Sequence, residues 1–219
     1  MHIPVIDLSH RIDESLPFYP GDPRPEIREF ARIDRDGFCV HQLHLGTHTG
    51  THIDAPSHFI PAGRTIEQLE LDRFIGPAVV IDCTDKGTRE AITLEDITRH
   101  SGSIGAGDIV LFYTGWDRKL HSPRYADHPY LLPEGAEWLV EQGVKVVGID
   151  ALNIDPTWTN HFPVHDILLG KEVLIVENLT NLDRIKDSRP LVMLLPLPLA
   201  GCDGSPIRAV ALPEGWTGQ

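Results

Sequence analysis

The sequence predicts an α/β fold in a single domain. Residues 77–83, 108–114 and 144–149 are predominantly apolar, and the first two stretches are typical of strands covered on both faces. Short stretches between them favour helices, and strands that alternate with short helices indicate an α/β fold. A chain of 219 residues suits one domain over residues 1–219, long enough to bury a substantial core.

The N-terminal part of the chain predicts strands separated by a proline-rich loop. Residues 3–8 alternate weakly between apolar and polar and predict a first strand, whereas 16–25 hold four prolines and predict a loop. Residues 26–33 and 38–45 then predict two strands joined by a hairpin-type turn at 34–37. The second of these strands leads into a histidine-rich stretch.

Capping residues and helix breakers delimit the elements that follow. Thr93, with Asp96 three residues later, is typical of a helix start. Pro133 and Gly143 predict the start and the end of a second helix over 133–142. In the remaining part we expect a short helix at 164–169 and strands at 173–176, 191–199 and 206–212.

The composition indicates a globular protein without a nucleic-acid or anionic-membrane partner. The formal charge is −13, and both partners favour an excess of Lys and Arg. No run reaches the ~20 apolar residues of a membrane span, and residues 1–4 do not begin a secretory signal. Cys39, Cys83 and Cys202 lie far apart, which suggests neither disulfides nor a thiolate metal site and favours a reducing cytoplasm.

Histidines concentrate in one stretch of the chain. Five of the 12 His fall within residues 41–58, where uniform scatter would place about one. Imidazole nitrogens with a carboxylate oxygen are the ligand set of zinc and neighbouring divalent ions. The stretch therefore predicts a metal site that includes His48, His52 and Asp54. The alternative, ordinary polar loop residues, suits a lone histidine better than a cluster.

The spacing of these ligands requires a bend. His48 and His52 would share one face of an extended strand, but four strand residues span ~13 Å, too far to share one ion or two ions ~3.5–4 Å apart. Neighbouring threonines, Gly50 and Pro56 disfavour a helix. We therefore expect a strand with a tight bend at Gly50, the residue that most readily permits one.

The same stretch resembles the signature of the metal-dependent cyclase family, to which bacterial kynurenine formamidase and isatin hydrolase belong. Weaker similarity lies at 20–22, 148–150 and 205–210. The resemblance implies the swivelling β/β/α fold of that family, with a mixed and largely buried sheet, a small-molecule substrate and a homodimer. The matching string is His48-Thr49-Gly50-Thr51-His52-x-Asp54-x-Pro56-x-His58.

The cluster around Asp54 offers too few ligands for two ions, so others must come from distant parts of the chain. Glu177 ends a predicted buried strand, where a carboxylate is costly unless it is paired or bound to a metal. The family has a His and a Glu twelve residues apart in this region; His165 and Glu177 have that spacing, and His161 does not. The alternatives are a histidine on a helix surface and a surface salt bridge.

The resemblance implies two divalent ions, with zinc as the first choice and manganese as the alternative. It gives His58 the position of the family's general acid/base, with direct metal ligation as the alternative. Such ions bring the pKa of water from 15.7 toward ~7, so the expected nucleophile is hydroxide, and His58 would protonate the leaving nitrogen. The implied metal ligands are His48, His52, Asp54, His165 and Glu177.

Candidate substrate-binding residues lie in the proline-rich loop. In the family an aromatic residue before the Pro-Gly-Asp turn faces the substrate, and here Tyr19 holds that place with Phe18 beside it. A loop aromatic that closes over the core is the alternative. His44 is a further candidate neighbour of the site, or else a surface residue. Many relatives have Ser where this chain has Asn153.

The residues indicate a metal site, and the family resemblance implies a metal-dependent hydrolase of a small aryl amide resembling N-formylkynurenine, an amidohydrolase acting on a C–N bond other than a peptide bond. Hydrolysis of a lactam such as isatin, or of a lactone, uses the same chemistry and is the first alternative. The second is a protein that binds metal without catalysis. A structural zinc site is closed and usually rich in Cys, so a free His beside an oxygen-containing site favours catalysis.

Overall fold

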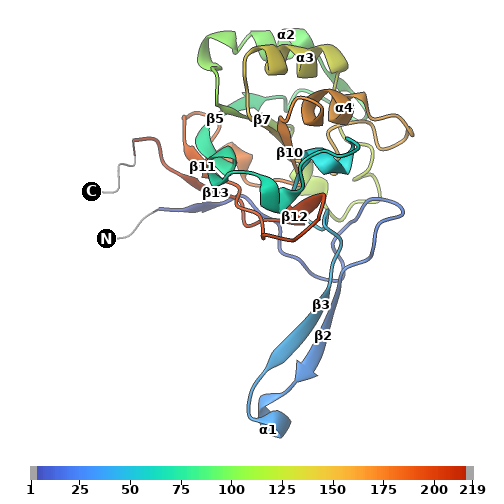
Figure 1. Cartoon of the computed structure of the whole chain (residues 1–219). Helices are drawn as coiled ribbons and strands as arrows, with labels where there is room; N and C mark the ends of the chain where they lie inside the picture. The colour runs from blue at the N-terminus through green and yellow to red at the C-terminus, as the bar shows by residue number, and fades with distance from the viewer. Residues whose placement is uncertain (1–3, 216–219) are drawn as a thin grey trace.

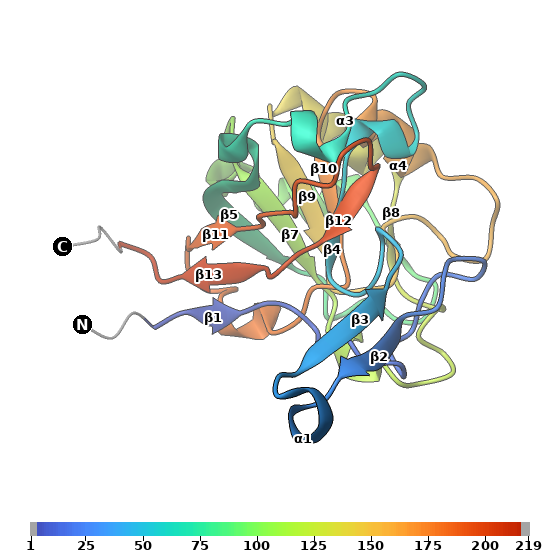
Figure 2. The ribbon, with the colours of Figure 1, turned by 60° about the horizontal axis from the view of Figure 1, so that its bottom comes forward.

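The computed structural model describes residues 4–215, and within this range nine strands form one mixed sheet (Figures 1 and 2). Their bounds are β1 Ile6–Asp7, β4 His52–Asp54, β5 Ile75–Asp82, β7 Ile109–Tyr113, β9 Val146–Ile149, β10 Leu174–Glu177, β11 Leu191–Met193, β12 Gly204–Pro206 and β13 Val210–Leu212. The order across the sheet is β1-β13-β11-β5-β7-β9-β10-β4-β12. The predicted α/β class with a mixed sheet is confirmed.

The centre of the sheet is parallel and buried. β5, β7, β9 and β10 pair in parallel with one another, and every residue of β7, β9 and β10 is buried. Successive side chains point to opposite faces, so Val110 and Phe112 join one apolar core while Ile109 and Leu111 join the other. The apolar stretches of the sequence are these strands, because a strand covered on both faces can be apolar at every position.

Short helices cover one face of this sheet. They are α2 Leu94–Thr98, α3 Pro133–Glu141 and α4 Pro163–Leu169, and they lie on the same side of the molecule (Figure 1). Thr93 and Asp96 form the predicted capping box at the start of α2. Pro133 is the first residue of α3, and Gly143, with φ 75°, follows its end.

Antiparallel pairing at one edge of the sheet brings distant segments to the histidine-rich stretch. β4 pairs with β10, which sets His52 opposite Glu177. β12 pairs with the other side of β4, which sets Asp54 opposite Gly204. A Cβ at Gly204 would lie 2.8 Å from a backbone oxygen of β4 and 3.1 Å from the ring of His48, so only glycine allows this approach. β4 is thus enclosed by two segments from much later in the chain.

A two-stranded hairpin projects from the body of the molecule (Figure 1). It consists of β2 Glu26–Ala31 and β3 Val40–His44, with the one-turn helix α1 Ile33–Asp36 at its tip. The predicted hairpin is confirmed, but its turn is helical and ends at Gly37, which has φ 78°. Every residue of β3 is exposed, so the hairpin has little contact with the core.

The terminal strands are shorter than the sequence predicts. The first is limited to β1, and Ile3 of its predicted range lies outside the described residues. The predicted strand 191–199 is shortened to β11, because Pro196 and Pro198 lack the N–H that a ladder requires. The predicted strand 206–212 is divided between β12 and β13.

The remaining elements are short. β6 Ala91–Ile92 and β8 Tyr130–Leu131 pair in parallel. The 3-10 helices are Pro56–His58, Ile66–Gln68, Leu71–Phe74, Ser101–Ser103, Trp116–Lys119 and Leu182–Arg184.

Between residues 4 and 215, no helix combines the length and the apolar character needed to cross a membrane.

Candidate metal centre

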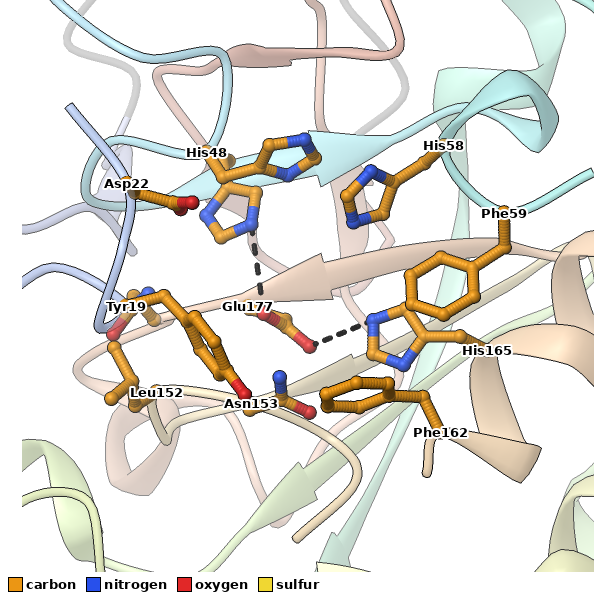
Figure 3. A pocket seen from close by; sticks show the side chains of 12 residues that line it. Tyr19, Asp22, His48, His58, Phe59, Leu152, Asn153, Phe162, His165 and Glu177 are labelled. Carbon is orange, nitrogen blue, oxygen red and sulfur yellow. Dashed lines mark ion pairs between the residues drawn. The ribbon is translucent and has the colours of Figure 1, made fainter. Parts of the chain in front are cut away.

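The predicted ligands meet at the edge of the sheet. Figure 3 shows His48, His165 and Glu177 of this set. His52 and Asp54 are alternate residues of β4 and point to the same face. Glu177, the last residue of β10, lies beside His52 in the ladder. His165 comes from the first turn of α4, and His48 comes from the turns before β4. The structure therefore brings together all five residues of the expected ligand set.

The predicted bend between His48 and His52 is confirmed. Gly50 has φ 68°, a left-handed conformation that glycine adopts without strain. A Cβ at this position would also meet Leu16 Cδ2 at 3.0 Å. The bend brings the centroids of the two imidazoles to 5.0 Å, far closer than a straight strand would allow.

Three imidazole nitrogens converge on two carboxylates. Asp54 Oδ1 lies 2.7 Å from His48 Nδ1 and 3.4 Å from His52 Nε2. His165 Nε2 lies 3.7 Å from Asp54 Oδ2 and 3.5 Å from Glu177 Oε1. His52 Nε2 and Glu177 Oε2 are 3.6 Å apart. The spacings of 3.4–3.7 Å suit atoms that bind a common ion, whereas the 2.7 Å between His48 Nδ1 and Asp54 Oδ1 is a hydrogen-bond distance.

The second nitrogen of each converging imidazole has its own acceptor. His52 Nδ1 lies 2.8 Å from the carbonyl oxygen of Gly50, and His165 Nδ1 lies 2.8 Å from Asp155 Oδ2. His48 Nε2 lies 3.0 Å from Asp203 Oδ2. An N–H donated to an oxygen at one nitrogen leaves the other free to bind a metal, and metal-ligating histidines have this arrangement.

Burial makes a bound cation the natural partner of this cluster. His52, Asp54, His165 and Glu177 are at most 4% exposed. Asp54 Oδ2 is a buried atom without a hydrogen-bond partner among the described residues. A buried carboxylate oxygen without a partner is costly. Since imidazoles and carboxylates are the ligands that divalent ions take, the residues present fit a metal site.

The electrostatics of the cluster also fit a cation. Burial would raise the pKa of Asp54, but the charges of His48 and His52 and their hydrogen bonds hold that pKa well below its usual value. Burial, with the charge of Asp54, raises the pKa of Glu177 to about 8. Burial would lower the pKa of His48, yet Asp54 and Asp203 raise it to about 10. Buried carboxylates thus compete for positive charge, which a divalent ion would supply.

Sets of three ligands overlap at this site. Among the described residues His48, His52 and Asp54 form one set, and Asp54, His58 and His165 form a second, in which one ligand atom of each residue lies within 4.8 Å of the others. Asp54 belongs to both sets. A third set, His48, His58 and Asp203, is partly exposed.

His58 lies between the cluster and an aromatic pocket. It ends the 3-10 helix Pro56–His58, its ring is 4.0 Å from that of His48 between centroids, and it points into the pocket (Figure 3). Tyr19, Phe59 and Phe162 line the pocket, and Phe59 and Phe162 contact each other edge to face at 5.6 Å. No Lys or Arg of residues 4–215 lines it. The pocket suits a small aromatic molecule without a strong negative charge.

Other candidate residues of the sequence lie outside this pocket. Phe18 and His161 are exposed and do not line it. His44 is exposed on β3. Asn153 does line the pocket, and its Oδ1 accepts a 2.7 Å hydrogen bond from the N–H of Asp155. This bond fixes the amide orientation, so the NH₂ group remains the free donor of Asn153.

Two carboxylates at the site were not expected from the sequence. Asp155 is fully buried and accepts hydrogen bonds from the backbone N–H groups of Val164 and His165 as well as from the ring of His165. Its position ten residues before His165 gives a weak signal of this role. Asp203 contacts His48 and His58. Its only sequence signal is that it precedes the stretch 205–210.

The sequence and the fold both have known relatives. The Cyclase family model matches residues 6–156. A kynurenine formamidase of Geobacillus thermodenitrificans is 36% identical over 208 residues, which cover 94% of this chain and 96% of that protein. The structure of an isatin hydrolase bound to the product analogue thioisatinate matches with a TM-score of 0.90 at 26% identity, covering 97% of this chain and 93% of that one. A potential metal-dependent hydrolase with cyclase activity matches with a TM-score of 0.78 at 30% identity, covering 96% and 98%.

Proposed function

The chain belongs to the Cyclase family, and from this premise we propose that it is a metal-dependent hydrolase that cleaves the C–N bond of a small aryl amide such as N-formylkynurenine. The kynurenine formamidase that matches nearly the whole chain supports the aryl amide. The isatin hydrolase structure supports a lactam as the second candidate substrate. Both reactions add water across an acyl–nitrogen bond, so one site serves either substrate.

The observation that carries this proposal is the buried set of imidazoles around Asp54. Its Oδ2 atom has no hydrogen-bond partner among the described residues, and it lies 3.7 Å from His165 Nε2. A structural zinc site is closed, whereas this set borders a pocket. An ion held there would therefore be open to a substrate.

We propose two divalent ions, zinc or manganese, at this site. Asp54 Oδ1 lies beside His48 and His52 and Asp54 Oδ2 lies on the side of His165, which supports its sharing between the ions. Bound ions would lower the pKa of water from 15.7 toward ~7 and polarise the substrate carbonyl. The proposed ligands are His48, His52, Asp54, His165 and Glu177, and Glu177 is the second candidate for a shared carboxylate.

The other residues of the pocket would bind the substrate and move a proton. Phe59, Phe162 and Tyr19 would hold an aromatic ring and exclude water from its faces. His58 points into the same pocket and would protonate the leaving nitrogen, a step worth roughly 10²–10⁴-fold in rate. Asn153 would donate its NH₂ group to a polar atom of the substrate. Phe18 is exposed beside Tyr19 and does not line the pocket, so Tyr19 is the aromatic residue of this loop that would contact the substrate.

A single hydrolase domain over residues 1–219 that forms a homodimer in the cytoplasm completes the proposal. One sheet with an apolar core on each face supports the single domain. The projecting hairpin supports the dimer, because Phe30, Ile33 and Phe38 are 56–72% exposed on it and a two-stranded hairpin alone in water is marginally stable. The three free cysteines support a reducing compartment. Equilibrium sedimentation that finds only monomer would refute the dimer.

A substrate and metal panel tests the proposed reaction. The protein loaded with zinc or with manganese is assayed with N-formylkynurenine, formanilide, isatin and a lactone. We expect turnover of an amide with at least one metal and none after chelation. Preference for isatin would select the lactam alternative. Bound metal without turnover on the whole panel would support a protein that binds metal without catalysis.

A further inference from the structure

One carboxylate outside the proposed ligand set contacts both a ligand and the proton-transfer residue. Asp203 Oδ2 lies 3.0 Å from His48 Nε2 and 3.0 Å from His58 Nδ1. Asp203 Oδ1 accepts a 2.9 Å hydrogen bond from the hydroxyl of Thr47. A single side chain from the C-terminal part of the fold therefore joins three residues of the histidine-rich stretch.

The sheet fixes the place of this carboxylate. The backbone N–H of Ala55 donates to the carbonyl oxygen of Asp203 at 2.9 Å, and the next residue, Gly204, pairs with Asp54 in the ladder between β12 and β4. The backbone of Asp203 is thus bound to the strand that carries the ligands. A group held on a regular strand pair keeps its geometry better than one on a loop.

This contact determines which nitrogen of His58 can act on a substrate. A neutral imidazole has one N–H donor and one acceptor nitrogen. The N–H at Nδ1 is donated to Asp203, so Nε2 is the nitrogen left to exchange a proton. Nε2 has no hydrogen-bond partner within residues 4–215, and the ring points into the pocket (Figure 3).

We propose that Asp203 is a positioning residue for hydrolysis: it holds His58 in the Nδ1–H tautomer, with Nε2 directed at the leaving nitrogen, and it orients the ring of His48. This inference rests on the proposed function. Nε2 carries no proton in this tautomer, so it first takes up the proton released when the added water becomes hydroxide. When the C–N bond breaks, the nitrogen keeps the bonding electron pair and takes that proton from His58 Nε2, and the acyl carbon keeps the oxygen of the added water. Asp203 stabilises the imidazolium that carries this proton, as a carboxylate does for the histidine of a catalytic triad.

Substrates that differ in their leaving groups separate this role from a structural one. Formanilide releases an aniline that must be protonated, whereas 4-nitrophenyl formate releases a phenolate that need not be. Asp203→Ala should lower kcat for formanilide by about 10²-fold or more, keep kcat for the ester within about threefold, and keep metal content by elemental analysis. The double variant with His58→Ala should be no slower on the amide than His58→Ala alone, because both changes affect one step. Asp187→Ala, at an exposed aspartate without contact to the cluster, is the control and should match wild type.

A spectroscopic readout tests the contact without activity. In the full-length, zinc-loaded protein, nitrogen-15 NMR should find His58 protonated at Nδ1 in wild type and shifted toward Nε2 protonation in Asp203→Ala. Asp203→Asn keeps an acceptor oxygen at the same place, so it should keep the wild-type tautomer. It also serves if the alanine variant does not fold.

Distinct outcomes would overturn the inference. Equal losses on amide and ester, loss of metal from Asp203→Ala, or an unchanged tautomer would each do so; metal loss would make Asp203 a ligand. If wild type cleaves neither substrate, the proposed function fails, and the tautomer of His58 alone decides whether Asp203 positions it.

Discussion

Asp54 has an unusual position because its two oxygens face different imidazoles. Oδ1 lies beside His48 and His52, and Oδ2 lies on the side of His165. The side chain is fully buried, so water cannot replace a lost partner. Single substitutions can therefore distinguish a residue that binds the metal from one that transfers a proton.

Asp54→Ala should lose bound metal, because it removes the carboxylate whose oxygens face His48 and His52 on one side and His165 on the other. His58→Ala should keep its metal and lose about 10²–10⁴-fold in kcat on an amide, since only proton transfer is removed. Elemental analysis and kinetics of both purified variants check this. Metal loss from the His58 variant would instead make His58 a ligand.

His128 should make stability depend on pH independently of the metal centre. It is fully buried, its Nδ1–H donates to the carbonyl oxygen of Pro129, and its Nε2 accepts from the hydroxyl of Thr157. Burial lowers its pKa from 6.5 to about 4. The unfolded chain therefore binds the proton more readily, so this contribution is complete above pH 6.5 and is lost as pH falls toward 4. The loss is on the order of 3 kcal/mol.

Urea unfolding at a series of pH values checks this expectation. His128→Gln should flatten the decline of the free energy of unfolding between pH 6.5 and 4. His121→Gln, at an exposed histidine, is the control and should keep the wild-type decline. The same decline in both variants would show that His128 is not its source.

The element that decides the geometry of the site is the bend before β4. Gly50 bends the chain so that the rings of His48 and His52, four residues apart, lie 5.0 Å from each other between centroids. Gly37 at the tip of the hairpin also has a positive φ, but nothing lies within 4 Å of the place of its Cβ. Alanine at either glycine would strain the backbone, but only alanine at Gly50 would also disturb the site. The two variants therefore form a matched pair.

Gly50→Ala and Gly37→Ala should each cost about 1–2 kcal/mol in stability from left-handed strain. Only Gly50→Ala should weaken zinc binding, by at least about tenfold, because its Cβ would press on Leu16 and displace the ligands. Chemical unfolding and zinc titration against a competing chelator measure the two effects. Unchanged zinc affinity in Gly50→Ala would mean that the bend does not need glycine.

Across the whole molecule, the strand order couples metal binding to folding. β4 lies between β10 and β12, and α4 adds His165, so the ligands assemble only when the sheet has formed. Asp54 and Glu177 are buried, and without a cation the burial and the charge of Asp54 raise the pKa of Glu177 to about 8. The folded state should therefore bind metal far better than the unfolded chain, and metal should stabilise it.

Chelation should lower the melting temperature by roughly 10 °C, as loss of a few kcal/mol does in a protein of this size. The reason is that the folded chain loses the cation that its buried carboxylates and imidazoles would bind, and that Glu177, with its pKa raised to about 8, then takes up a proton. Calorimetry with and without chelator measures the shift, and added zinc should reverse it. Asp54→Ala should melt at one temperature in both conditions; a shift as large as that of wild type would place the bound metal elsewhere.

Much of this architecture follows from local sequence. The central strands are read directly from apolar stretches, because strands buried on both faces exclude polar residues. Helix ends are also local signals. The side chain of Thr93 caps the start of α2, Pro133 has the φ that the first residue of α3 requires, and Gly143 adopts the positive φ that follows the end of α3. The ligands His48, His52 and Asp54 are close in the chain, so their convergence requires only the bend at Gly50. Glu177 is indicated by its place at the end of a buried strand, and the spacing of the resembled family adds His165.

By itself, the sequence determined the α/β class, the central strands and the local half of the metal centre, since each depends on residues within one turn or one strand of each other. Only the tertiary structure decided that Asp155 supports His165, that Asp203 joins His48 to His58, and that Phe162 closes an aromatic pocket. Such contacts depend on the order β10-β4-β12, which the chain adopts to bury both faces of its sheet as a whole. The residues next to Asp155 or Asp203 in the sequence do not indicate which segment will lie beside either aspartate in the fold.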